Sequence, residues 1–90
     1  MFDFSEIINE LDRQLADRHV EYCVRIPMFG SNVVCVSTAS DRHPLTVCLG
    51  FDCIVAFRDG VNHFFALVDG LEESVRPLAR LAETVFEGAR

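Results

Sequence analysis

Several features that would assign this chain to a specific class are missing from it. Lysine is absent, and eight Arg face fourteen Asp and Glu, which gives a net charge of −6. Because nucleic-acid binding depends on basic groups that displace counterions from phosphates, this charge disfavours direct nucleic-acid binding. No apolar run approaches the roughly 20 residues that cross a bilayer. The first residues also lack the basic region and apolar run of a secretory signal. We therefore expect a cytoplasmic protein that binds neither nucleic acid directly nor a membrane.

Catalytic motifs are also missing. The five glycines are isolated from one another, so the sequence contains no phosphate-binding loop, nucleophile elbow or dinucleotide fingerprint. Cys53 and Arg58 are separated by an apolar segment, 54–57, which is typical of a strand and not of a phosphate-cradling loop. We predict no catalytic residues and no cofactor, and therefore that the protein is not an enzyme.

Four cysteines and three histidines are the candidate metal ligands. Cys48 and Cys53 lie at the edge of the spacing found in zinc sites. On one regular strand, however, side chains five residues apart point to opposite faces, and only a tight bend at Gly50 would bring these two together. We predict reduced, structural cysteines and no metal site. The alternative is a metal or redox module that uses Cys48 and Cys53 with Cys23 or Cys35 and a histidine.

The 90 residues, half of them hydrophobic, indicate a single domain over residues 1–90. Helical spacing of apolar residues predicts an N-terminal helix over 4–18, with Asp3 as N-cap and Glu6 completing a capping box. A second helix is predicted near the C-terminus. Its N-cap would be Ser74, because Pro77 is tolerated only in a first turn, and it would end at Gly88.

The chain between the helices has the period of two that is typical of strands. We predict strands over 20–26 and 33–38, joined by a turn over 29–32, and a surface loop over 40–44. An unbroken series of odd-numbered apolar residues runs from Leu45 to Phe57, and Gly50 is placed to bend it into two strands. Asp59-Gly60 predicts a two-residue type I′ hairpin, in which Arg58 opposes Val61 and Val55 opposes Phe64.

This register divides the apolar residues between two faces of the sheet. We assign one face to the core; it comprises Phe51, Cys53, Val55, Phe57, Phe64, Ala66 and Val68. The opposite face is also too apolar to remain in water, so we predict that it binds a partner. Its residues are Ile54, Ala56, His63, Phe65 and Leu67, with Asp52 as the one charge beside them.

The predicted fold is a two-layer α+β domain of order α-β-β-β-β-(β)-α, with a mainly antiparallel sheet of four or five strands and both terminal helices on one face. The predicted function is a small acidic protein-binding module, an adaptor or inhibitor that docks on a larger protein. A narrower form of this hypothesis is a phage-type inhibitor of a host complex that targets nucleic acid. The alternative is an obligate homodimer with a structural or chaperone-like role, formed through the same face.

Overall fold

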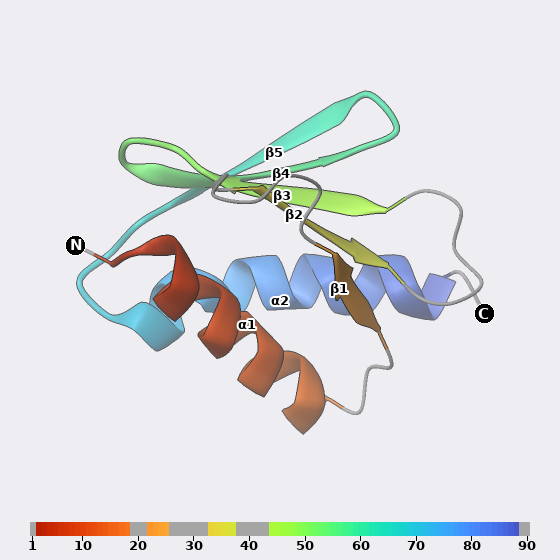
Figure 1. Cartoon of the computed structure of the whole chain (residues 1–90), viewed down its shortest axis with the longest axis horizontal. Helices are drawn as coiled ribbons and strands as arrows, with labels where there is room; N and C mark the ends of the chain where they lie inside the picture. Colours follow the sequence, from red (N-terminus) through yellow and green to blue (C-terminus); the bar gives the residue numbers. More distant parts are fainter. Residues whose placement is uncertain (1, 19–21, 26–32, 38–43, 89–90) are drawn as a thin grey trace.

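The computed structural model describes residues 2–18, 22–25, 33–37 and 44–88. These residues form two helices and five strands: α1 (Phe4–Asp17), β1 (Cys23–Arg25), β2 (Val33–Ser37), β3 (Leu45–Leu49), β4 (Cys53–Arg58), β5 (Val61–Ala66) and α2 (Leu71–Gly88). Both helices lie on the same side of the sheet and form a second layer (Figure 1). The predicted two-layer α+β arrangement is confirmed. The predicted loop over 40–44 lies almost wholly outside the described residues, as do the ends of the predicted strand 20–26.

The sheet is an antiparallel meander in which strands pair in the order β1-β2-β3-β4-β5. Arg58 pairs with Val61, Val55 with Phe64 and Cys53 with Ala66, so the register predicted from the hairpin is confirmed. Asp59 and Gly60 both have positive φ, 52° and 82°, as a type I′ turn requires. Local turn chemistry therefore determines how β4 and β5 are aligned.

Helix α1 begins where the sequence predicts. The Asp3 carboxylate accepts a hydrogen bond from the Glu6 backbone N–H at 2.8 Å, and the Glu6 carboxylate accepts one from the Asp3 N–H at 3.2 Å. This capping box satisfies donors that the first helical turn leaves without a partner. The helix then buries Ile7, Leu11 and Leu15 against the rest of the molecule.

Helix α2 begins earlier than predicted. It starts at Leu71, which places Ser74 inside the helix and Pro77 beyond the first turn, so the assignment of Ser74 as N-cap is wrong. Ser74 is buried, and its hydroxyl oxygen accepts a hydrogen bond from the Val68 N–H at 2.9 Å. Its own proton can go to the carbonyl of Gly70 at 2.8 Å or of Val68 at 3.1 Å. Ser74 therefore joins the helix to the segment that leads out of β5.

The hydrophobic core lies between the helices and the face of the sheet that carries Leu45, Val47, Ile54 and Ala56, all of them fully buried. We call this the inner face. From the helices it receives Val75, Leu78, Ala79, Ala82 and Phe86 of α2, together with the buried residues of α1. The prediction that Phe51, Val55, Phe57 and Phe64 form the core is wrong, because the helices cover the other face.

The reversal arises at the turn between β3 and β4. Gly50 ends β3, its N–H donates to the Cys53 carbonyl at 2.8 Å, and Phe51 and Asp52 form a two-residue loop. Leu49 then pairs with Ile54, so an odd-numbered residue lies beside an even-numbered one on the same face. The odd series therefore does not stay on one face. Its first half, in β3, is buried, and its second half, in β4, points the opposite way.

Candidate functional site

The face of the sheet opposite the helices is the candidate functional site, and we call it the outer face. The register aligns Cys48 of β3, Val55 of β4 and Phe64 of β5 in one row across it, with Val33 of β2 next to Cys48. The neighbouring rows contain Cys35, Thr46, Phe57 and Asn62 on one side, and Cys53 and Ala66 on the other. None of these ten residues is charged. Arg25 of the edge strand β1 pairs with Cys35 and adds a charged residue at the end of one row.

Large aromatic side chains are exposed on and beside the outer face. The exposed fractions are 89 % for Phe51 in the β3–β4 turn, 42 % for Phe57 and 68 % for Phe64. Val68, which follows β5, is also exposed. Single exposed apolar residues are normal on protein surfaces, but contiguous apolar patches usually mark a contact with another molecule. From β3 to β5 the outer face is such a patch, and the lack of charged residues on these strands' outer side makes it poorly suited to water.

The residues predicted from the sequence as partner-binding lie elsewhere. Ile54 and Ala56 are fully buried beneath the helices, so they cannot contact a partner in this fold. His63, Phe65 and Leu67 are partly buried on the inner side, where Phe65 and Leu67 pack against the core. Asp52 is exposed in the turn before β4, and its carbonyl accepts a hydrogen bond from the Leu67 N–H at 3.1 Å. The prediction of an exposed partner-binding face therefore requires correction, because the structure places five of its residues on the inner face: Ile54, Ala56, His63, Phe65 and Leu67.

Sequence reasoning missed Phe51, Phe57 and Phe64 as candidate contact residues because it placed them in the core. The signal that identifies them is the two-residue loop at Phe51-Asp52. A two-residue hairpin always pairs odd-numbered with even-numbered positions, since the paired numbers then have an odd sum. When the rule is applied to the Phe51-Asp52 turn as well as to the Asp59-Gly60 turn, it places Val55 and Phe57 on the opposite face of the sheet from the odd-numbered apolar residues of β3.

His63 has a definite packing partner on the inner side. Its ring stacks on that of Phe65, with the ring centroids 6.5 Å apart and the planes inclined by 8°. The two residues are adjacent on the same side of β5, which explains the stacking. The geometry gives His63 a packing role beneath the β4–β5 hairpin and leaves it off the outer face.

Three cysteines, Cys35, Cys48 and Cys53, are partly exposed free thiols on the outer face. The bend at Gly50 does bring Cys48 and Cys53 to the same face, the condition that a shared site requires. Within the described ranges, however, no three His, Cys, Asp or Glu side chains converge closely enough to hold a metal ion. The cysteines therefore contribute small, soft, polarisable side chains to the outer face.

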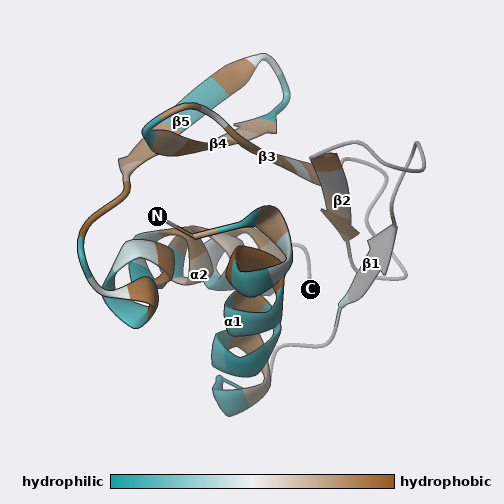
Figure 2. Cartoon of the chain, turned by 60° about the vertical axis from the view of Figure 1, so that its left-hand side comes forward, coloured by the Kyte–Doolittle hydropathy of each residue, from teal (hydrophilic) through white to brown (hydrophobic). Residues whose placement is uncertain are grey.

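Charge is concentrated on the helix layer. Arg13 contacts Glu10 at 2.6 Å, Asp17 at 3.1 Å and Glu72 at 3.6 Å, so it joins acidic residues of both helices. The hydrogen bond from Arg13 lowers the pKa of Glu10, against the opposing effect of burial, and a second hydrogen bond from Gln14 adds to the lowering. Figure 2 shows hydrophilic colour on the outward turns of α1 and hydrophobic colour along β3 and β4.

Gln14 anchors the charged cluster to the helix interface. This buried residue donates to the Glu10 carboxylate at 2.7 Å and to the Glu72 carbonyl at 3.0 Å, so it ties α1 to the start of α2. Near the α1 C-terminus, Arg18 forms an ion pair with Glu83 at 3.4 Å. Both contacts hold the two helices in register beneath the inner face.

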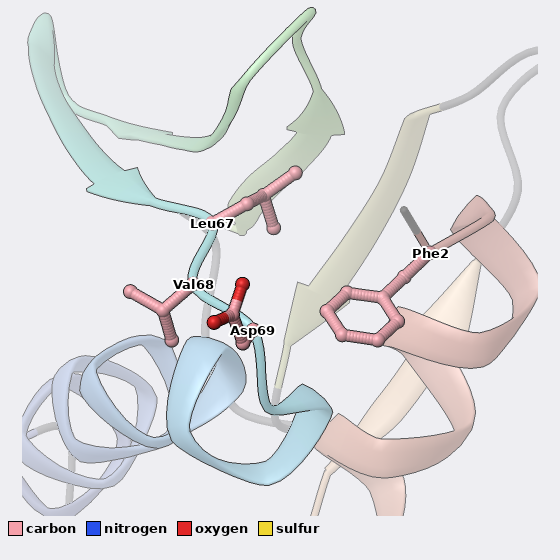
Figure 3. A pocket seen from close by; sticks show the side chains of 4 residues that line it. All are labelled: Phe2, Leu67, Val68 and Asp69. Atoms are coloured by element: carbon pink, nitrogen blue, oxygen red, sulfur yellow. The ribbon is translucent and has the colours of Figure 1, made fainter.

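A hollow of about 290 Å³ lies where the N-terminal segment meets the connection from β5 to α2. Its lining residues are Phe2, Leu67, Val68 and Asp69, with the Phe2 ring approaching from the N-terminal side (Figure 3). Ligand sites are generally 300 to 1,000 Å³ and combine apolar walls with several converging polar groups. Asp69 alone supplies a charged group here, so the outer face is the stronger candidate.

Comparison with known protein families, with curated protein sequences and with solved structures gives no match to this chain. No helix among the described residues is long and apolar enough to cross a membrane. The two sheet faces, one covered by helices and one not, therefore carry the structural evidence on function.

Proposed function

We propose that this chain is a protein-binding module, an adaptor or inhibitor without catalytic activity, that works with its outer face covered by another protein surface. The observation that carries the proposal is the uncharged row of Cys48, Val55 and Phe64, flanked by exposed Phe57 and Phe51. Interfaces are built in this way, with aromatic anchors in a desolvated centre and charged groups kept at the rim.

The sheet supports this role better than the helix layer does. An inhibitor of a complex that targets nucleic acid could imitate phosphates with the acidic residues of α1 and α2. Arg13, Arg18 and Arg76, however, pair with carboxylates on these helices, which neutralises part of the charge locally. We therefore assign docking to the outer face and regard the helices as the layer that holds the sheet in shape.

The proposal is tested by the accessibility of the outer-face thiols in the assembly that the protein forms in its native host. The tagged chain is isolated under native conditions, alkylated, and mapped by mass spectrometry at Cys48 and Cys53. We expect both thiols to react slowly in the wild-type assembly and quickly in Phe64→Asp, because the added charge disfavours burial of this face.

The matched control is Asn9→Asp, which adds the same charge at an exposed position of α1. Its alkylation pattern is expected to equal that of the wild type. Equal and fast reaction of Cys48 and Cys53 in all three proteins would show that nothing covers the outer face, and the proposed function would then be wrong.

A further inference from the structure

We infer that the outer face is covered by a second copy of this chain, so that two sheets pack face to face in a symmetric homodimer. This inference rests on the proposed function and names the partner for the same surface. Three observations carry it: the exposed apolar area, the distribution of charge and the alternation of large and small side chains.

The exposed apolar area is of the size that a small dimer requires. The exposed fractions of Phe51, Phe57 and Phe64 together equal about two whole phenylalanine side chains, or roughly 300 to 500 Å². This alone approaches the largest patch on a typical monomer, roughly 300 to 600 Å². Val55, Val68 and the partly exposed cysteines add to this area, and a standard interface buries ~800 Å² per partner.

The distribution of charge favours a partner with an equally uncharged surface. The ten residues named above from β2 to β5 offer no charge that would select a basic or acidic partner, and the charged residue that the register adds, Arg25, lies on the edge strand β1. A second copy presents the same uncharged centre from β3 to β5, so no ion is buried there without a counterion.

Each chain carries a net charge of −6, yet its ion-paired helices lie on the far side of the sheet. Packed layers are about 10 Å apart. Two stacked sheets with helices outside therefore hold the helix layers roughly 30 Å from each other. Since the Debye length is about 8 Å at physiological salt, repulsion between the helix layers is largely screened.

Side-chain size alternates across the outer face in a way that suits self-association. The large pair Val55 and Phe64 lies next to the small pair Cys53 and Ala66. In a two-fold arrangement each patch meets its own copy, so the Phe64 of one chain can pack over the small pair of the other. Facing sheets pack through interdigitated side chains of this kind, with the strands inclined by about 30°.

The experiment is the mass of the purified chain alone in solution, measured by light scattering over a concentration series. We expect the wild type to have twice the 10.1 kDa mass of one chain, and Phe64→Asp to have the mass of one. Phe64→Thr replaces one residue of high β-propensity by another in β5, so it is expected to weaken the dimer while its circular dichroism stays that of the folded wild type. Asn9→Asp is expected to remain a dimer.

The outcomes separate this inference from the proposed function. A wild type that is monomeric at every concentration, or a dimer that neither Phe64 variant weakens, overturns the second copy as the occupant. If the monomeric wild type nevertheless shows slow alkylation of Cys48 and Cys53 in the assembly from its host, the docking function stands with a different partner. Fast alkylation of Cys48 and Cys53 in that assembly would contradict both the homodimer and the docking function.

Discussion

The two faces of one sheet differ little in composition and greatly in environment. The inner face has Val47, Ile54 and Ala56 fully buried, whereas the outer face has Val55 half-buried and Phe64 largely exposed. Apolar content alone does not distinguish which of the two faces forms the hydrophobic core. The helices therefore determine which face is interior, because the amphipathic stripes of α1 and α2 can cover only one face of the sheet.

The test with the largest expected change in stability is the truncation of one side chain on each face. Ile54→Ala leaves a cavity in the core and is expected to lower the free energy of unfolding by about 2 to 5 kcal/mol. Its neighbour Val55 points outward, so Val55→Ala is expected to cost less than about 1 kcal/mol within a single chain. Both are measured by urea unfolding in the Phe64→Asp background, where association does not contribute. Equal losses would contradict the assignment of the faces.

The second test weakens the connection that brings α2 beneath the inner face. Ser74→Ala removes the hydroxyl that accepts the Val68 N–H and leaves this donor without its partner. We expect a loss of roughly 1 to 3 kcal/mol in the free energy of unfolding. Thr84→Ala is the control, since its hydroxyl donates to the Arg80 carbonyl on the exposed side of the same helix. A loss as small as that of the control would mean that Ser74 does not hold the connection.

The third test concerns the hairpin that builds the outer row. Gly60 has a φ of +82°, a conformation that a Cβ atom destabilises, so Gly60→Ala is expected to cost roughly 1 to 2 kcal/mol. Gly60→Asn is the control, because asparagine adopts positive φ more readily. Thermal unfolding followed by circular dichroism compares the two variants. A Gly60→Ala protein as stable as the wild type would show that the turn does not limit stability.

The smallest expected effect is a pH dependence on the helix layer. The pKa of Glu10 is lowered below the ordinary value of 4.5, chiefly by the hydrogen bond from Arg13. The unfolded state therefore binds more protons in this range, so the stabilisation is complete above pH 4.5 and is lost as the pH falls through the lowered pKa. We expect Glu10→Gln to be less stable than the wild type near neutral pH, with the difference shrinking in acid. Urea unfolding at several pH values measures it, and a difference that grows in acid would contradict the assignment.

Much of the fold followed from local signals. Asp3 and Glu6 specified the start of α1, and Asp59-Gly60 specified the pairing of β4 with β5, because caps and tight turns depend on a few neighbouring residues. The start of α2 was predicted four residues late, at Val75 and not at Leu71. Proline is generally tolerated only in the first turn of a helix, but Pro77 lies further inside α2, where the packing of the helix and the Ser74 hydrogen bonds accompany it.

The candidate site was harder to predict, and the reason is specific. Alternation identifies two faces but does not say which one the helices meet. The covered face depends on the two-residue turn Phe51-Asp52, which places odd-numbered residues of β3 and even-numbered residues of β4 on the same face. It also depends on the path of the chain after Val68. The sequence did predict that one apolar sheet face is left without a helix. The prediction placed Ile54 and Ala56 on that uncovered face, because the odd-numbered apolar residues from Leu45 to Phe57 were all assigned to one face of the sheet.

The meander also has a consequence for the order in which the protein is made. Each described strand pairs with its neighbour in the chain, so the sheet needs only short loops to close and can assemble as the polypeptide emerges. Helix α2 contains the last described residues, and it supplies five of the buried core side chains. Until translation reaches it, only α1 is present to cover the inner face, so much of that face stays in water together with the outer face. We expect the nascent chain to be most prone to aggregation just before α2 is complete, when the inner face is still only partly covered.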